Sequence, residues 1–574
     1  MQNFQILLFI ALLLNGLTKN QKEGPKFISP VKIPLSLSAN FGELRVDHFH
    51  SGLDIRTQGV TGKEVFAVAD GYVYRISVSP GGFGNALYVK HPSGYSTVYG
   101  HLDRFIPEIE DYVTSRQYEE KSFMVTLWPP KDKFRFSQGD LIAYSGNSGS
   151  SSGPHLHYEM RKSDDETPVN PLLYDFGITD EHKPVIEKVA ICPAGRHTSI
   201  NGQNRTVRMS VSGGSGNYHL AADEIKISGP AAFEIRAYDL INNSSNRFSV
   251  YSIELRIDSV PVYKYVMDSF SFDESRYINS HIDYETYLRD KSYIERSFIL
   301  PNDRLSVVRR TVNRGIFDFS DGERHNVEII VADAGNNTAK VSFGVRSVPQ
   351  AAVVSGSPVR HPGNAIVMPY GRNNKFVSKN ISVMIPSGAL YDTLEFEFSR
   401  SSGSAAMYSE IYHVHNVYTP LHKAYTLSIR PDRIPAGKES KMLIVHTDSE
   451  KNEVPVGGTW ENGVLTARPM TFGIFYVGID TVPPRIVPVS FTPGDNLSGR
   501  ASLRIGISDD FSGIKTYEPM VDGKWALFEY DQKNNQLIYK FDADRITKGI
   551  SHSLVLTATD NRDNQSVYKC DFTW

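Results

Sequence analysis

The chain passes from Ser145-Gly-Asn-Ser-Gly-Ser-Ser-Ser-Gly-Pro154 directly into His155-Leu-His157-Tyr-Glu-Met-Arg161. The first run predicts an extended loop, and the second predicts a strand. Residues i and i+2 of a strand point to the same face, so we expect His155 and His157 to face one cavity and Leu156 the other side. Two histidines at this spacing are also typical of an exposed strand face, but the loop that leads into them favours an open, accessible site.

Two other stretches with histidine precede this strand. In His48-Phe-His50-Ser-Gly-Leu-Asp54, Gly52 permits a tight bend between His50 and Asp54. Zinc binds imidazole nitrogen and carboxylate oxygen at about 2.0 to 2.2 Å, so this pair can converge on one ion. Alone, the pattern is more often a surface pair. The stretch Val98-Tyr-Gly-His101-Leu places a histidine at the end of a short strand, where it would by itself be a core or surface residue.

The composition describes a folded, mainly β protein of several domains. With 574 residues, 40 % hydrophobic and 22 % charged, the chain is too long for one core, and about three to five domains are expected. Short runs of β-forming residues recur between clusters of turn-forming residues, and the 44 Gly and 31 Pro of the chain favour such breaks between strands. The net charge is −3, from 61 basic and 64 acidic residues, which argues against nucleic acid or an anionic membrane as partner.

The first folded domain is expected over residues 25–175, with an antiparallel, barrel-like β-sheet, and it contains every stretch described above. Two later segments, 183–348 and 483–574, look like copies of an immunoglobulin-like sandwich. Each contains an alternating apolar strand that runs into an Asp/Asn turn, Val327-Glu-Ile-Ile-Val-Ala-Asp in one and Leu554-Val-Leu-Thr-Ala-Thr-Asp in the other.

A linker of small residues and Pro, Ser347 to Gly363, leads into a third β-sandwich domain over residues 360–480. We expect no cluster of titratable groups at ligand or catalytic spacing in these three domains. Their Asp/Asn-rich turns are interpreted as turn chemistry first, with calcium binding as the alternative. Spacing, packing or binding of a partner is their expected role.

Residues 1–21 begin with an apolar run of the length of a signal-peptide core, too short to span a bilayer comfortably. Export is the favoured interpretation, and an uncleaved anchor is the alternative, because the run lacks a preceding Lys or Arg and a clear cleavage site. Only Cys192 and Cys570 are present, so neither a disulfide framework nor a cysteine-based zinc site is expected. Any metal must be held by histidine and carboxylate.

Together these motifs resemble the LytM/lysostaphin family of zinc peptidases. The family's signatures are His-x-Gly-x-Asp, a His-Leu after a Tyr-containing strand, and Gly-Pro-His-Leu-His, in that order. The sequence carries them as His50-Ser-Gly-Leu-Asp54, Tyr99-Gly-His101-Leu102 and Gly153-Pro-His-Leu-His157. Two strands between them, Val68-Ala-Asp-Gly-Tyr-Val and Gly84-Asn-Ala-Leu-Tyr-Val-Lys-His91, also look like the family's. The resemblance covers about a quarter of the chain.

The resemblance implies that His50, Asp54 and His157 bind one Zn²⁺ ion and leave a fourth position for water, as in catalytic zinc sites. His101 and His155 would then be catalytic, one accepting a proton and the other stabilising the oxyanion, in an order that is left open. It also implies an exported endopeptidase, in the periplasm or cell envelope or secreted, that hydrolyses stem or cross-link peptides of peptidoglycan.

Residues 106–132 are an apparent insertion into this domain. Pro107, Glu108 and Glu110 at the start and Ile109 and its helical-spacing partners predict a short amphipathic helix. The helix would either pack on the β-sheet or form a wall or lid of the substrate groove, and a lid would make activity conditional.

Two other functions stay open. The first is a catalytically silent or gated LytM-like regulator whose sandwiches dock envelope proteins, and the second is an envelope scaffold. The presence of every expected motif position favours the active enzyme.

Overall fold

The computed structural model describes residues 26–220, 224–349 and 366–574. The expected leader at 1–21 and most of the expected linker at 347–363 lie outside these residues. Along the described parts of the chain, no helix combines the length and the apolar character needed to cross a bilayer.

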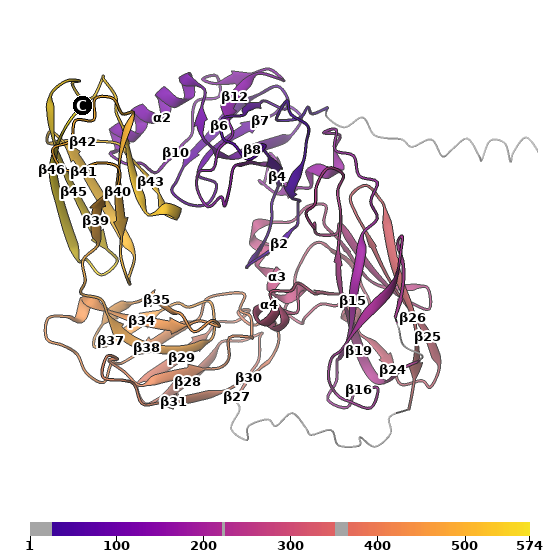
Figure 1. Cartoon of the computed structure of the whole chain (residues 1–574). Helices are drawn as coiled ribbons and strands as arrows, with labels where there is room; N and C mark the ends of the chain where they lie inside the picture. Colours follow the sequence, from indigo (N-terminus) through magenta and orange to yellow (C-terminus); the bar gives the residue numbers. More distant parts are fainter. Residues whose placement is uncertain (1–25, 221–223, 350–365) are drawn as a thin grey trace, which may run out of the picture.

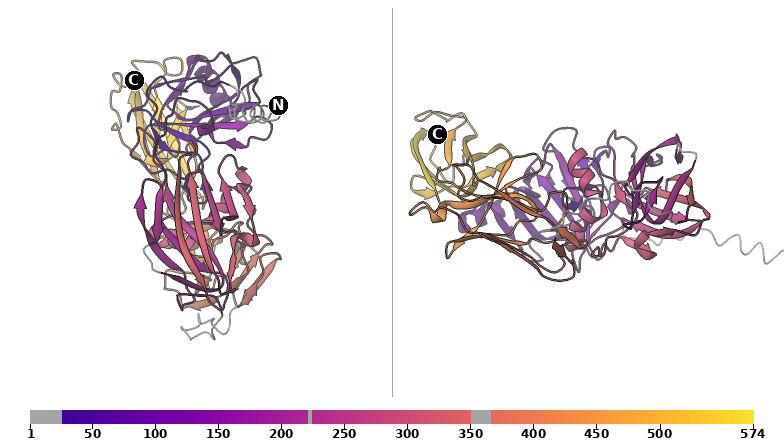
Figure 2. Two further views of the ribbon diagram at one scale, coloured as in Figure 1. Left: turned by 90° about the vertical axis from the view of Figure 1, so that its right-hand side faces the viewer. Right: turned by 90° about the horizontal axis from the view of Figure 1, so that it is seen from below.

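The prediction of a mainly β protein with β-sandwich domains is confirmed. The β domains follow one another around a ring, from the indigo and purple N-terminal domain to the yellow last sandwich (Figure 1). In the turned views the last sandwich again lies beside the N-terminal domain, so the first and last domains of the described chain are in contact (Figure 2).

The N-terminal domain contains β1 to β14. Its main sheet has the strand order β1-β4-β13-β8-β7-β6-β10, with β11 and β14 paired at its sides, and a smaller sheet has the order β5-β12-β9. The strands of the main sheet are β1 (Leu37–Ala39), β4 (Leu53–Arg56), β6 (Gly71–Val78), β7 (Asn85–Lys90), β8 (Tyr95–Leu102), β10 (Val125–Leu127), β11 (Arg135–Phe136), β13 (His155–Lys162) and β14 (Pro168–Val169). The others are β2 (Leu44–Arg45), β3 (His48–Phe49), β5 (Glu64–Phe66), β9 (Arg104–Phe105) and β12 (Leu141–Tyr144).

The predicted helix in the insertion forms as α2 (Pro107–Glu120). It starts at a proline, has acidic Glu108 and Glu110 in its first turn, and ends at Lys121 in the left-handed conformation, which suits helix ends. Ile109 and Val113 are buried. One side of α2 packs on β9 and β10 of its own domain.

The first sandwich contains β15 to β26. Its long strand β19 passes from one layer to the other at Gly229, whose φ of 88° is accessible to glycine at little cost. Its strands are β15 (Val185–Pro193), β16 (Ser199–Ile200), β17 (Val207–Gly214), β18 (Asn217–Leu220), β19 (Ile225–Tyr238), β20 (Ser252–Ile257), β21 (Val260–Val266), β22 (Glu295–Arg296), β23 (Val308–Thr311), β24 (Phe317–Phe319), β25 (Arg324–Ala332) and β26 (Thr338–Ser347). Short helices are η1 (Pro171–Leu173) before it, and η2 (Phe272–Tyr277), α3 (Ile278–His281), α4 (Tyr284–Asp290) and η3 (Asn313–Gly315) within it.

The middle sandwich contains β27 to β38, in two five-stranded sheets and the pair β27–β30. Its elements are β27 (Ile366–Met368), β28 (Asn374–Ser378), β29 (Ile381–Ile385), β30 (Leu394–Phe396), β31 (Phe398–Ser401), β32 (Ile411–Val414), β33 (Thr426–Ile429), η4 (Glu439–Lys441), β34 (Met442–Thr447), β35 (Glu453–Gly457), β36 (Thr459–Glu461), β37 (Val464–Ala467) and β38 (Gly473–Ile479).

The last sandwich contains β39 to β46 in two four-stranded sheets. Its elements are β39 (Arg485–Pro488), β40 (Ser502–Ser508), β41 (Ile514–Val521), β42 (Lys524–Trp525), β43 (Phe528–Asp531), η5 (Gln532–Asn534), β44 (Gln536–Lys540), β45 (Ser551–Asp560) and β46 (Gln565–Thr573).

The hydrophobic core of the N-terminal domain continues into the first sandwich without a break, whereas the middle and last sandwiches each have a core of their own. Cys192 and Cys570 are not joined by a disulfide, and both thiols are free. The last sandwich touches the N-terminal domain through Tyr118 of α2, whose ring lies 5.3 Å from that of Trp525 and nearly perpendicular to it.

Two glycine turns in the N-terminal domain pack against each other. Gly84 and Gly149 both have positive φ, 62° and 66°. A Cβ on Gly84 would overlap the Ser148 Oγ and the Gly149 N, because the two backbones are in direct contact. The Ser148 Oγ also donates to the Leu102 O at 2.8 Å and accepts from the Asn85 N at 3.0 Å. Glycine at this position therefore holds the Ser145–Pro154 loop against β7.

We predict that Gly84→Ala destabilises the protein more than Gly94→Ala does. Both glycines have positive φ, so each substitution costs about 1–2 kcal/mol for the left-handed backbone. Gly94 faces open space, whereas the overlap at Gly84 adds about 1–3 kcal/mol. Differential scanning calorimetry should show the larger fall in Tm for Gly84→Ala. Equal shifts would contradict the close approach of the two turns.

Candidate metal centre and active site

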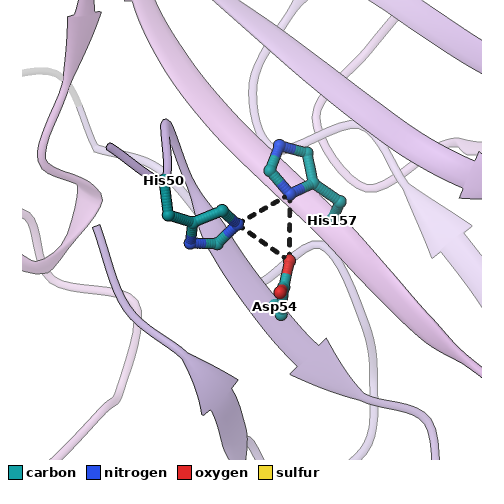
Figure 3. A group of neighbouring side chains, drawn as sticks. All are labelled: His50, Asp54 and His157. Atoms are coloured by element: carbon teal, nitrogen blue, oxygen red, sulfur yellow. Dashed lines mark hydrogen bonds and ion pairs between the residues drawn. The ribbon is translucent and has the colours of Figure 1, made fainter. Parts of the chain in front are cut away.

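Antiparallel pairing of β4 and β13 places Asp54 directly opposite His157. Residues paired in this way have Cβ atoms about 4.5–5.5 Å apart, so their side chains meet on one face of the sheet. His50 lies on the turn that leads from β3 into β4. In Figure 3 the two imidazoles and the Asp54 carboxylate point toward one another from these elements.

The three groups are close enough to hold one ion. The Asp54 Oδ1 lies 3.1 Å from the His50 Nε2 and 2.9 Å from the His157 Nδ1, and these two nitrogens are 3.1 Å apart. Ligands at about 2.1 Å in a tetrahedral site are about 3.4 Å apart, so a zinc ion needs only a small outward movement of each side chain. The donor set of two nitrogens and one oxygen fits zinc.

Each imidazole has an acceptor at its outward nitrogen, which orients its inward nitrogen toward the other two groups. The His50 Nδ1 donates to the Asn40 carbonyl at 2.8 Å, so the proton lies there and the Nε2 keeps its lone pair. The His157 Nε2 lies 2.9 Å from the Glu159 Oε1, so a donated proton on that nitrogen leaves the Nδ1 lone pair for an ion.

Glu159 was given no role from the sequence. It is fully buried, its Oε2 accepts from the Arg161 Nε at 2.6 Å, and it also accepts from the Ser51 hydroxyl. Burial opposes its charge, but Arg161 and His157 hold its pKa at about 2. The signal was present in the strand, since His155, His157, Glu159 and Arg161 alternate with apolar residues and must share one face.

The metal-free site already favours negative charge on Asp54 and positive charge on His157. Burial works against the Asp54 carboxylate, but His50, His155 and His157 hold its pKa well below its usual range. Burial likewise works against a charged His157, yet Asp54 and Glu159 raise its pKa to about 9. A metal ion that binds the His157 Nδ1 must therefore displace a proton.

His101 and His155 stand beside the three metal-ligand candidates, with ring centroids 4.8 Å apart. The His101 Nδ1 donates to the Ser148 carbonyl at 2.9 Å, and the His155 Nδ1 lies 2.8 Å from the Gly153 carbonyl. The His101 Nε2 thus remains for a reacting molecule, and the His155 Nε2 lies 3.4 Å from the Asp54 Oδ1. Burial and the neighbouring imidazoles lower the pKa of His101 to about 3, which keeps this ring neutral.

The backbone of His101 is left-handed, with φ at 57°. A residue other than glycine pays about 1–3 kcal/mol for such a conformation, and it persists only where surrounding structure enforces it. Here the His101 N donates to the Phe83 carbonyl at 2.8 Å, and the ring is held by Ser148. This conformation places the imidazole over the pocket at the end of β8.

An open pocket of about 530 Å³ is lined by the three metal-ligand candidates and by His101 and His155. It has walls from Phe83 in the N-terminal domain and from Phe272, Ser275 and Arg276 in the first sandwich. The contribution of the sandwich was not expected from the sequence. No residue of the insertion 106–132 lines the pocket, so α2 packs on the sheet and does not form its wall.

The other histidines near the motifs have separate places. His48 is exposed at the pocket rim, and its Nδ1 lies 2.8 Å from the Val46 carbonyl. His91 is buried away from the pocket and contacts the Asp70 carbonyl and the Thr97 hydroxyl. Neither belongs to the group that can hold a metal.

Two protein families match the chain. Peptidase family M23 matches residues 48–118, and the Zu5-like domain matches residues 365–480, which correspond to the middle sandwich.

Curated relatives match about a fifth to a quarter of the chain. The DD-carboxypeptidase/endopeptidase Mpg of Neisseria meningitidis is 31 % identical over 157 residues, which are 26 % of this chain and 30 % of the relative. An uncharacterized metalloprotease of Haemophilus influenzae is 32 % identical over 123 residues, 21 % of this chain and 20 % of the relative. The murein hydrolase activator NlpD of Escherichia coli is 30 % identical over 125 residues, 22 % of this chain and 26 % of the relative.

The chain thus spans less than a third of the length of these relatives. Among solved structures, a zinc-containing peptidase from Vibrio cholerae is 25 % identical and matches 27 % of this chain and 41 % of its own, with a TM-score of 0.20. With the motif residues gathered in one pocket, the family match and the relatives lead to one conclusion. The N-terminal part of this chain is a LytM/lysostaphin-type peptidase domain of family M23, followed by further β domains.

Proposed function

We propose that the protein is an exported zinc-dependent endopeptidase that hydrolyses stem or cross-link peptides of peptidoglycan. The observation that carries the proposal is the complete site: His50, Asp54 and His157 meet within hydrogen-bonding distance, and His101 and His155 face the same pocket. A zinc ion bound there would polarise a carbonyl and lower the pKa of water towards about 7.

The residues of the chain would supply the remaining chemistry. Asn40 and Glu159 orient the imidazoles of His50 and His157, so both ligand nitrogens are in place before an ion arrives. His101 and His155 flank the scissile bond, and their Nε2 atoms provide one proton acceptor and one hydrogen-bond donor to the oxyanion. The two roles stay unassigned between them.

The substrate class rests on the relatives. One relative is called a DD-carboxypeptidase/endopeptidase and another a murein hydrolase activator, and both names refer to cell-wall chemistry. The open pocket of about 530 Å³ suits this class, because it is large enough to take part of a peptide beside the metal ligands. A location in the cell envelope follows from the same proposal.

We predict that the zinc-loaded protein releases peptides from purified peptidoglycan and that His155→Ala and His101→Ala each reduce the rate by about 10²–10⁴-fold. Each removes a group that faces the reacting atoms but leaves the three metal ligands intact. Mass spectrometry of released fragments gives the rate and names the bond that is cut.

His48→Ala serves as the matched control, because His48 lies at the pocket rim outside the metal group. It should keep close to wild-type activity. Zinc-loaded wild type that releases no peptide from several wall chemistries would contradict the proposal.

We predict that Glu159→Gln weakens zinc binding by about 10–100-fold, because the charged partner that orients and polarises His157 is lost. Competition with a chromophoric zinc chelator measures the affinity. The matched control is Glu166→Gln, since Glu166 also pairs with Arg161 but does not touch His157. If both variants bind zinc as tightly as wild type, Glu159 does not support the metal site.

A gated enzyme is the second candidate, and a specific contact favours it. Lys533 of the last sandwich donates to the carbonyls of Asn147 and Ser151, at 3.3 Å for Ser151. These residues belong to the loop that leads into His155, and the Ser151 Oγ lies 3.1 Å from the His155 Nδ1. The last sandwich therefore holds the rim of the pocket.

For the gated enzyme, we predict that Lys533→Ala changes the rate of peptide release by at least about threefold. The lost exposed hydrogen bond is by itself worth about 0.5–1.5 kcal/mol of protein stability, and the change in rate should exceed the effect of that loss. The comparison variant is Lys524→Ala, at an exposed lysine of the same sandwich. The same assay of released peptides applies. Equal rates for both variants and wild type would remove the gate and leave the ungated endopeptidase.

A further inference from the structure

Three carboxylates converge where the peptidase domain joins the first sandwich. Asp180 lies in the connector before β15, Asp239 follows β19 directly, and Asp333 follows β25 directly. One oxygen of each lies within 4.8 Å of the other two. The expectation that the sandwiches contain no cluster of titratable groups was therefore wrong, because the three residues are far apart in the sequence and meet only through the fold.

One oxygen of this cluster is buried without a partner. Asp239 is only 3 % exposed, and its Oδ1 has no hydrogen-bond partner among the described residues. Asp180 and Asp333 are better satisfied, since they accept from the backbone N of His182 and of Asn337. A buried carboxylate oxygen normally has a donor or a cation, so this one calls for an explanation.

The negative charge of the cluster is also uncompensated. Within the described residues, none of the three carboxylates forms an ion pair with Lys, Arg or His, whereas buried Glu159 pairs with Arg161 and buried Glu295 with His281. Burial, together with the other two carboxylates, raises the pKa of Asp239 to about 8. A bound cation would remove both the repulsion and the unsatisfied oxygen.

There is room for an ion with its water. A cavity of about 240 Å³ lies between the two domains, with Asp180 and Asp239 on its sandwich side and Asn40 and Asn170 on its peptidase side. On Gly335, a Cβ would lie 3.3 Å from the Asp333 Oδ1, so glycine leaves this oxygen accessible.

We propose that Asp180, Asp239 and Asp333 bind one calcium-class divalent cation at this junction. The donors are all oxygens, which calcium prefers and which do not suit zinc. Calcium–oxygen distances of about 2.4 Å allow two ligands of one ion to lie up to about 4.8 Å apart, and the three carboxylate oxygens lie within 4.8 Å of one another. Water in the cavity would complete the six to eight ligands that calcium takes, on the order of three to five of them.

The ion would stabilise the junction and takes no part in peptide hydrolysis. Asn40 lines the same cavity, donates from its side chain to the Ser249 carbonyl at 2.8 Å, and accepts from His50 through its own carbonyl. The cation site and the orientation of a metal-ligand candidate thus share one interface between the two domains.

The last sandwich provides an internal comparison. Asp480 lies in the connector before it, Asp509 follows β40 and Asp560 ends β45, and oxygens of these three also lie within 4.8 Å of one another. There the residue that corresponds to Asp239 is Asp509, and it accepts from the backbone N of Phe511 and of Gly513. Both bonds go to its Oδ2, and neither oxygen of Asp509 is among the described atoms that are buried without a partner.

The test is calorimetric titration of the full chain, freed of divalent ions, with calcium chloride, in parallel with thermal unfolding. Wild type should bind one more ion than Asp239→Asn, and calcium should raise the Tm of wild type by more than that of the variant. Without calcium, Asp239→Asn should unfold at the same or a higher temperature than wild type, because it removes repulsion. The measurement is repeated in the His50→Ala background, so that the peptidase site is not the source of binding.

Two further variants, one at a second proposed ligand and one as a control, complete the test. Asp180→Asn, at a less buried member, should weaken binding by at least about tenfold, as expected when a ligand is altered. Asp318→Asn, at an exposed aspartate of the same sandwich, should bind as wild type does. Equal binding by wild type and Asp239→Asn, including no binding by either up to millimolar calcium, would overturn the proposal, as would tighter binding of magnesium than of calcium.

Discussion

The register between β4 and β13 is the constraint on which the site depends. It places Asp54 opposite His157, and a slip of one residue would turn every side chain of β13 to the other face of the sheet. The register is secured from the other side by a ladder from His157 to Lys162 along β8. A continuous core beneath the sheet excludes the alternatives, since Leu156 and Tyr158 are buried on the opposite face.

Beside these paired strands, each buried charged side chain lies next to one of opposite charge. Arg161 pairs with Glu159, Glu159 with His157, and His157 with Asp54. Removing one member would leave an unpaired charge in a dry environment, which is more costly than the loss of a surface ion pair. At the junction with the first sandwich, by contrast, Asp239 is buried and its Oδ1 has no hydrogen-bond partner among the described residues. The charges from Arg161 to Asp54 thus balance one another, whereas those of the Asp239 cluster do not.

Local patterns in the sequence were enough to predict the mainly β fold, the strand that carries His155 and His157, and the helix that starts at Pro107. The shared face of that strand followed from its period of two, and the same period would have pointed to Glu159. Tertiary contributions were not predictable in this way. Arg276 reaches the pocket because two domains pack together, and Asp239 reaches its cluster because strands distant in the sequence pack within one sandwich. No local pattern records either kind of packing.

The proposed function depends on one zinc ion held by His50, Asp54 and His157. The most direct test is a crystal structure of the zinc-loaded protein with anomalous diffraction measured on both sides of the zinc absorption edge. We expect one strong anomalous peak, bonded to the His50 Nε2, the His157 Nδ1 and an Asp54 oxygen at about 2.0–2.2 Å. A peak bonded to other residues, or no peak at these three, would contradict it.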